Sequence, residues 1–352
     1  MAAGERQAPE GPIEIRRLTQ ADADRWDRFV ERMPEATFFH RAGWKQVLER
    51  AFRHATYYLF AESAGEILGI LPLGHVRSRM FGNGLISTPF CVYGGSVATS
   101  REIGDLLDAE ACRLARELKV DYLELRCRDR RHEDWPAKDL YVTFRKPIDP
   151  DPETNLLAIP RKQRAMVRKG IKAGLESRTD QSVDSVYRVY SESVRNLGTP
   201  VFSSRYFSIL KEVFQDDCEA LTVHHGNELI AGVLSFYFRD QVLPYYGGGT
   251  AQARDLKAND FMYWEVMRRA CERGVKVFDY GRSKRGTGSF DFKKNWGFEP
   301  EPMFYEYHLV KAKRIPEVNP LNPKYRLFID TWKRLPLPIS RLIGPFLARN
   351  LG

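Results

Sequence analysis

The sequence is poor in cysteine and has no long apolar run, and each shortage excludes a class of protein. Of the 352 residues, five are cysteines, which are widely spaced and form no CxxC pair: Cys91, Cys112, Cys127, Cys218 and Cys271. This pattern argues against a disulfide framework and against a zinc site. No apolar stretch approaches the ~20 residues that span a bilayer, and residues 1–11 lack the apolar core of a secretory signal. We therefore expect a soluble, cytoplasmic protein with reduced thiols and no bound metal.

Motifs for metal binding and covalent catalysis are missing as well. The seven histidines show neither HxxxH nor HExxH spacing, and no GxSxG elbow marks a serine hydrolase. Residues 286–288 carry two glycines but lack the rest of a phosphate-binding or dinucleotide-binding loop. Because no Ser or Cys nucleophile is indicated, direct transfer of a group is favoured over a covalent enzyme intermediate.

Composition and charge describe a folded protein that handles anions. A hydrophobic fraction of 43% with 12% aromatics supports real cores, and 352 residues suggest two domains. The 55 Lys and Arg against 46 Asp and Glu give a formal net charge of +9. This moderate excess fits phosphates, nucleic acid or a membrane surface without choosing among them.

The two halves of the chain match each other. Three blocks recur in the same order and at nearly the same spacing: GEILGILPL from Gly65 with NELIAGVLSF from Asn227, VYGG from Val92 with YYGG from Tyr245, and LKVDYLELR from Leu118 with RGVKVFDYGR from Arg273. The repeat is too long for a solenoid unit, so we interpret it as a tandem duplication of one domain.

The duplicated unit predicts a mixed α/β (α+β) fold. Each copy is expected to run from helices through an antiparallel meander to a strand, a helix and a further strand. We place the first domain at residues 13–150 and the second at 151–315, followed by a basic tail at 316–352. The boundary follows KPIDPDPE from Lys146, a Pro- and Asp-rich segment typical of a linker.

A glycine pair follows one strand in the second copy. The expected strand Gln241–Tyr246 runs into Gly247 and Gly248, and a helix is expected over 259–273. A strand that ends in glycines and leads to a helix places backbone N–H groups where an anion could bind. A simple tight turn is the alternative.

The densest cluster of reactive residue types lies at residues 279–298. An expected strand ends at Asp279, a Gly/Ser/basic loop follows, and FDFKKNWGF from Phe290 is expected to return as a strand. Loops with charged residues at strand ends are common places for sites. A surface hairpin with solvated lysines is the competing interpretation. Lys284, Arg285 and Lys294 are expected to be solvated or to face phosphates.

A basic helix is expected at the start of the second domain. Residues 161–172 contain six basic residues and no acid, and Arg161, Arg164, Arg168 and Lys172 recur at spacings of three and four. They therefore line one face, which suits the phosphates of tRNA, of a nucleotide-linked sugar or of a lipid head group. The alternative is a solvated face.

Three segments resemble the FemAB-like aminoacyl- and acyltransferases, which carry two tandem GNAT-like domains. They are the paired Tyr-Gly-Gly blocks, RKQRAMVRKGIKAGL from Arg161 and FDYGRSKRGTGSFDFKKNWGF from Phe278. The resemblance covers about Ile13–Leu309 and is most specific over Tyr246–Phe298. LPLGHVRSRMFGNGLISTPFCVYGG from Leu71 is most similar to the branch found with exosortase/PEP-CTERM protein-sorting and exopolysaccharide loci.

The resemblance implies a transferase that moves an acyl group onto an amine. In the better-understood members the donor is an aminoacyl-tRNA and the acceptor a peptidoglycan precursor. Their Phe-Lys pair corresponds to Phe292 and Lys293, and the lysine stabilises the charge that develops on the ester carbonyl. A fixed cation beside an oxyanion is often the largest catalytic contribution. Asp279 or Tyr246 would serve as base or positioning group. The expected substrate-binding residues are Arg164, Arg168, Arg282, Arg285, Gly247, Gly248 and Phe292.

The chain also departs from that family. The second domain has no long helical arm, and the branch is not tied to peptidoglycan, so an exopolysaccharide amine or a sorted protein is an equally reasonable acceptor. Acyl-CoA is the alternative donor, although neither half contains a Q/R-x-x-G-x-G/A pyrophosphate loop. We expect no tightly bound cofactor, and a phosphate-bearing or lipid-linked envelope precursor as partner. Because the first copy lacks a counterpart to FDFKKNWGF, we place the chemistry in the second domain.

Two other classes of function stay open at this point. A non-catalytic module that binds tRNA or another nucleic acid would explain the charge and the basic helix, although no DNA- or RNA-binding motif is present. The tail mixes apolar and basic residues and could lie on the inner face of the membrane. Three prolines interrupt it, and an extended tail packed on the second domain is the preferred interpretation.

Overall fold

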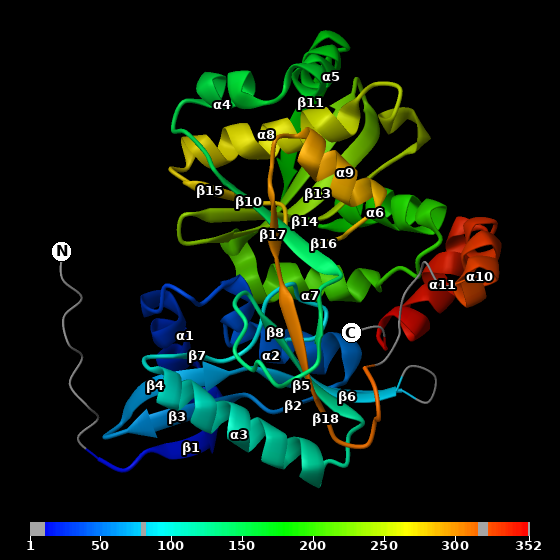
Figure 1. The fold of residues 1–352 in the computed structure, drawn as a ribbon. Coiled ribbons are helices and arrows are strands. Elements are labelled where there is room, and N and C mark those ends of the chain that lie inside the picture. Colours follow the sequence, from blue (N-terminus) through cyan, green and yellow to red (C-terminus); the bar gives the residue numbers. More distant parts are fainter. Residues whose placement is uncertain (1–10, 79–81, 316–322, 351–352) are drawn as a thin grey trace. The chain divides into compact units, whose positions relative to one another are not determined.

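The computed structural model describes residues 11–78, 82–315 and 323–350, which divide into two compact units. The first comprises Met1–Glu49, Arg53–Ala137 and Phe304–Pro316, and the second comprises Arg50–Phe52, Lys138–Met303 and Glu317–Gly352. The chain therefore returns to the first unit after building most of the second (Figure 1).

The first unit contains two sheets with the strand orders β1-β3-β4-β7 and β2-β5-β6-β8-β18-β9. The strands are β1 (Glu14–Arg17), β2 (Ala55–Thr56), β3 (Leu59–Ser63), β4 (Glu66–Leu71), β5 (Leu73–Ser78), β6 (Gly82–Ser87), β7 (Val97–Ala98), β8 (Tyr122–Cys127), β9 (Ala137–Lys138) and β18 (Phe304–Leu309). The helices are α1 (Ala23–Arg32), α2 (Gly43–Val47) and α3 (Arg101–Glu117).

Helix α3 covers the core of this unit. Ser100 caps its start by accepting a hydrogen bond from the Ile103 N–H at 3.4 Å. The helix buries Ile103 and Leu107 against β4, where Gly69 permits the contact because a Cβ there would lie 2.8 Å from Ile103. The spacing of four residues between these apolar positions is the reason why one face turns inward.

The second unit is built on a mixed sheet with the order β11-β12-β13-β14-β15-β10-β16, and β17 also pairs with β10. The strands are β10 (Tyr141–Pro147), β11 (Leu175–Asp180), β12 (Cys218–His225), β13 (Glu228–Phe238), β14 (Gln241–Gly249), β15 (Val277–Asp279), β16 (Ser283–Lys284) and β17 (Pro300–Pro302). The helices are α4 (Pro152–Ala158), α5 (Arg161–Lys172), α6 (Asp184–Leu197), α7 (Ser204–Phe214), α8 (Ala258–Glu272), α9 (Gly288–Asn295), α10 (Pro323–Lys333) and α11 (Leu337–Ala348).

Strands β14 and β15 are parallel but pair over only two residues. Gln241 lies opposite Val277 and Val242 opposite Phe278, after which β14 continues to Gly249 while β15 ends at Asp279. Beyond Val242 the two strands therefore make no further ladder. Helices cover both faces of β14: Gly247 faces Tyr263 of α8, and Gly248 packs on Tyr190 of α6.

The duplication predicted from the sequence is visible in the topology. Strand β6 pairs in parallel with β8 across α3, and β14 pairs in parallel with β15 across α8. The expected mixed α/β fold is confirmed, because both units combine helices with sheets that contain a parallel pair. The glycine pairs differ, because Gly247 and Gly248 lie inside β14, whereas Gly94 and Gly95 lie in a loop after β6.

The structure departs from the sequence-based expectations in several places. Strand β10 pairs with β15, β16 and β17 of the second unit, and β18 pairs with β8 of the first, so the linear division at residue 150 does not match the compact units. Residues 316–322 of the expected tail lie outside the described ranges. The rest of the tail is not extended but forms helices α10 and α11, which pack on α6.

A search of the described helices for a membrane span finds none that has the necessary length and hydropathy.

The strand expected over FDFKKNWGF is wrong, because residues 290–295 of this segment lie in helix α9. Thr287 caps the helix by accepting from the Phe290 N–H at 3.4 Å. Phe292 and Trp296, four residues apart, lie on one side with ring centroids 6.0 Å apart. The alternation of Phe with polar residues over 290–293 resembles a strand only locally.

Candidate active site

Lys293 lies in α9 with its side chain directed at the turn after β15. Its Nζ donates to the carbonyl oxygens of Tyr280 at 2.8 Å, Gly281 at 3.0 Å and Arg282 at 3.0 Å. Three carbonyl acceptors require three N–H donors, which only the charged ammonium provides. The same group lies over the Phe144 ring, 5.7 Å from its centroid. Lys293 thus fixes a cation at the end of β15.

The environment of Lys293 perturbs its protonation. Burial lowers the pKa of Lys293 to about 7, the Asp279 carboxylate opposes this shift, and Arg282 adds to it. The carbonyl oxygens around Nζ also favour the charged form. A strongly perturbed pKa at the end of a strand is typical of functional sites.

Asp279 is buried and supports the same turn. Its Oδ1 accepts from the Gly281 N–H at 2.7 Å, and its Oδ2 lies 3.3 Å from Nε of Arg145, the residue opposite it on β10. These contacts give Asp279 the geometry of a positioning group that shapes the turn holding Lys293.

Tyr280 supplies a polar group that the sequence alone did not single out. Its side chain is 4% exposed, and its hydroxyl has no hydrogen-bond partner among the described residues. The ring packs between Tyr263 of α8 and Phe292 of α9, at 5.0 and 6.3 Å. Burial raises the pKa of Tyr280 well above its usual value, so the hydroxyl keeps its proton and can donate it in a hydrogen bond.

The structure does not bring Tyr246 to Lys293. Its hydroxyl hydrogen-bonds Tyr206 of α7 at 2.7 Å, and its ring lies 5.4 Å from Tyr190 of α6. Gly247, the next residue, faces α8 instead, because successive strand residues point to opposite faces. Burial also raises the pKa of Tyr246 far above its usual value. Tyr246 therefore belongs to the aromatic core beside α6 and α7.

Other expected substrate-binding residues lie around the turn. The Arg282 guanidinium stacks 4.6 Å from the Tyr141 ring centroid, and Arg285 is exposed. Gly247 leaves room beside Tyr263, whose hydroxyl would lie 3.0 Å from a Cβ placed there. Phe292 packs against the core next to Lys293. Lys284 is not simply solvated, because burial, with Arg282 and Lys138, lowers its pKa to about 8.

The basic face of α5 lines a groove. A pocket of about 330 Å³ is lined by Arg161, Arg164, Ala165, Arg168, Lys169 and Lys172. Arg164 is partly fixed by donating to the Leu157 carbonyl at 2.6 Å, whereas Arg168 is exposed. The groove therefore presents cations without a carboxylate in its lining.

A buried carboxylate connects this helix to α9. Asp260, in the first turn of α8, accepts through Oδ1 from Gln163 of α5 at 3.1 Å and from the Trp296 indole at 3.0 Å. Burial raises the pKa of Asp260, and these two hydrogen bonds oppose the shift. The Asp260 carboxylate thus connects α5, which carries the basic groove, with the end of α9, which carries Lys293.

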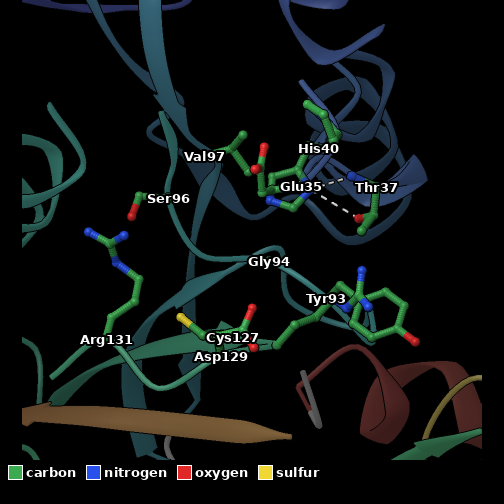
Figure 2. Close-up of a pocket in the computed structure, with 12 residues that line it drawn as sticks. Glu35, Thr37, His40, Tyr93, Gly94, Ser96, Val97, Cys127, Asp129 and Arg131 are labelled. Carbon is green, nitrogen blue, oxygen red and sulfur yellow. Dashed lines mark hydrogen bonds between the residues drawn. The ribbon is translucent and has the colours of Figure 1, made fainter. Parts of the chain in front are cut away.

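The first unit holds a pocket that the sequence did not indicate. It measures about 320 Å³, and its lining includes His40, Gly94, Arg128 and Arg131 (Figure 2). Nδ1 of His40 accepts from the Thr37 N–H at 3.1 Å, which leaves Nε2 to face the Gly95 carbonyl at 3.3 Å. The VYGG match is the sequence feature that could have indicated this pocket, because it aligns Gly94 with Gly247 in the repeat.

Comparison with known proteins agrees with this geometry. Residues 161–294, which include α5 and Lys293, match the family model described as an acetyltransferase (GNAT) domain. This match indicates an acyltransferase.

Solved structures resemble most of the chain at low sequence identity. The crystal structure of FemX is 15% identical and covers 90% of this chain and 100% of its own, with a TM-score of 0.63. A tandem GNAT protein from the clavulanic acid biosynthesis pathway is 14% identical. The match covers 86% of this chain and 100% of that protein, with a TM-score of 0.53. The C-terminal domain of a putative lysylphosphatidylglycerol synthetase from Agrobacterium fabrum is 13% identical. The match covers 82% of this chain and 91% of that domain, with a TM-score of 0.56. Comparison with curated proteins finds no match.

Proposed function

We propose that the chain transfers an aminoacyl or acyl group from an activated ester to an amine on a cell-envelope precursor, an exopolysaccharide or a sorted protein. The observation that carries the proposal is the Lys293 ammonium, fixed by three carbonyls at the end of β15 inside the acyltransferase domain. This is the place where developing negative charge would be stabilised.

The reaction needs few groups from the protein. The amine nitrogen attacks the ester carbonyl carbon, a C–N bond forms, and the carbonyl oxygen becomes an oxyanion. The ester C–O bond then breaks, and the leaving oxygen takes the proton that the amine loses. Lys293 would stabilise the oxyanion by its charge, and the unpartnered Tyr280 hydroxyl would donate a hydrogen bond to it. Asp279 would hold the turn rather than act as base.

The region before α8 favours an aminoacyl-tRNA ester over acyl-CoA. A CoA pyrophosphate would need free N–H groups in this region, but in the loop before α8 the N–H groups of Ala253, Asp255 and Lys257 already donate to carbonyls of the same loop. The Asp260 carboxyl also occupies the first turn of that helix. The cationic groove on α5 would instead bind the phosphates of tRNA through Arg164 and Arg168.

Acyl-CoA stays the second candidate donor, because the matched family model describes acetyltransferases. We further propose that the acceptor bears phosphate or is lipid-linked, which would bring the enzyme to the inner face of the membrane. Arg282 and Arg285 would face that substrate. The resemblance of the segment from Leu71 supports the exosortase/PEP-CTERM branch and an exopolysaccharide or a sorted protein as acceptor.

A transfer assay tests the proposal. Total tRNA charged with a tritiated amino-acid mixture serves as donor, and a nucleotide-linked peptidoglycan precursor or a chitosan oligosaccharide serves as amine acceptor. Lys293→Ala should lower kcat by about 10²–10³-fold, the loss typical of removing an oxyanion-stabilising group. Lys294→Ala, an exposed lysine on the same helix, is the matched control and should keep wild-type turnover. Equal rates for the two variants would refute the role of Lys293.

A further inference from the structure

The last two helices carry most of the exposed large apolar side chains. Six of the ten found in the described residues lie on α10 and α11: Leu327, Phe328, Ile339, Leu342, Ile343 and Phe346. The other four are scattered singly over α3, α4, α5 and α6. Isolated exposed apolar residues are ordinary, whereas a contiguous set marks an interaction surface.

Helix α11 packs on the second unit through its small residues. Ser340, Gly344 and Ala348 follow each other at intervals of four and are buried. A Cβ on Gly344 would lie 3.0 Å from the backbone of Val201, so the approach is close. Arg341 adds a hydrogen bond of 2.9 Å from Nε to Oγ of Ser191 on α6. These contacts fix which face of the helix points outward.

The outward face is the one with the large apolar side chains. Ile339, Leu342, Ile343 and Phe346 follow the 0, 3, 4, 7 spacing of a single helical stripe, and Leu342 and Phe346 are 69% and 66% exposed. An amphipathic helix on a globular protein normally turns such a stripe to the core. Here the stripe faces away from the core, which indicates that an apolar medium or partner covers it.

Charge identifies the covering partner. Residues 323–349 contain six basic residues, Lys324, Arg326, Lys333, Arg334, Arg341 and Arg349, against a single acid, Asp330. An apolar stripe flanked by an excess of cations is complementary to anionic head groups above acyl chains. Two copies of this surface would repel each other, which argues against self-association. With 12 residues, α11 is too short to cross a bilayer and would lie along its surface.

We propose that α10 and α11 form a docking surface for an anionic lipid bilayer, into which Leu342 and Phe346 insert. This inference depends on the orientation of α11 and not on the chemistry at Lys293. It therefore stands or falls separately from the proposed acyl transfer.

Sedimentation with vesicles tests the docking surface. The full chain is mixed with phosphatidylglycerol or with phosphatidylcholine vesicles, and the bound fraction is measured against lipid concentration. We expect binding to phosphatidylglycerol, and a partition coefficient that is about tenfold or more lower in the Leu342→Ser/Phe346→Ser variant. Serine removes the apolar groups without changing the charge, and both sites are exposed, so the thermal midpoint should stay that of the wild type.

Matched controls separate docking from general charge attraction. Leu106→Ser/Leu157→Ser removes two exposed leucines from α3 and α4 and should bind as the wild type does. Two results of the vesicle experiment would overturn the proposal. One is the absence of binding to phosphatidylglycerol. The other is equal binding by the Leu342→Ser/Phe346→Ser variant, which would move the contact to the cationic groove of α5. A lipid-free dimer that this variant abolishes would also overturn it, in favour of self-association.

Discussion

At the scale of single residues, Lys293 combines a charged ammonium with a site that disfavours charge. Burial lowers its pKa to about 7, while the Tyr280, Gly281 and Arg282 carbonyls hold three N–H groups in place. Burying a charged lysine costs free energy, and lysines with a strongly shifted pKa are typical of functional sites. The sequence pointed to Lys293 only through the family resemblance, because residue type and spacing do not reveal which lysine is buried.

The pH dependence of transfer follows from this environment. Because the proposed role needs the ammonium form, kcat should fall as pH rises through about 7. Lys293→Arg keeps its charge to a much higher pH, so any activity left in that variant should lack this falling limb. The measurement is kcat from pH 5.5 to 9 for both proteins. Deprotonation of the acceptor amine affects both proteins alike, so pH profiles of the same shape for the two proteins would contradict the role of the Lys293 ammonium.

The Tyr280 hydroxyl is the second residue-scale prediction. A buried hydroxyl without a partner costs about 1–3 kcal/mol, so Tyr280→Phe should leave the free energy of unfolding equal or raise it. If the hydroxyl donates to the oxyanion, the same variant should lose about 10–100-fold in kcat. Urea unfolding and the transfer assay are measured together. A variant that is stabilised with unchanged kcat would show that the hydroxyl has no part in the reaction.

At the scale of elements, the sequence predicted those with strong periodicity and missed those set by tertiary context. The basic helix α5, the helix α8 and the strand β14 lie close to their expected ranges. The helix α9 was missed, because its Thr287 cap and the packing of Trp296 outweigh a local alternation of Phe and polar residues. The site depends on this difference, since only a helix brings Lys293 back to the turn after β15.

The groove on α5 makes an element-scale prediction. If its cations bind tRNA phosphates, Arg164→Ala/Arg168→Ala should reduce the slope of log affinity against log salt by about 2, near 0.9 for each lost contact. Arg205→Ala, an exposed arginine on α7, should leave the slope unchanged. Filter binding of total tRNA from 50 to 300 mM NaCl gives the slopes. Equal slopes for the wild type and both variants would show that Arg164 and Arg168 in the groove do not contact tRNA phosphates.

At the scale of the whole molecule, the internal repeat predicted a duplicated α/β domain, and the family resemblance predicted that both copies are GNAT-like. It did not predict that the chain crosses back, so that β18 completes the first unit beside β8 and β10 joins the sheet of the second. Strand exchanges of this kind arise from pairing between distant segments, which one sequence does not encode in its local pattern. The pocket around His40 and Gly94 was missed for the same reason.

Ligand-induced thermal stabilisation tests the central claim most directly. The purified chain is heated with aminoacyl-tRNA, with uncharged tRNA or with acetyl-CoA. A ligand at about a hundred times its dissociation constant stabilises by roughly 2.7 kcal/mol, which moves the midpoint by several degrees. We predict a larger shift with aminoacyl-tRNA than with uncharged tRNA, and none with acetyl-CoA. A shift with acetyl-CoA alone would contradict the ester donor and make the chain a CoA-dependent N-acyltransferase.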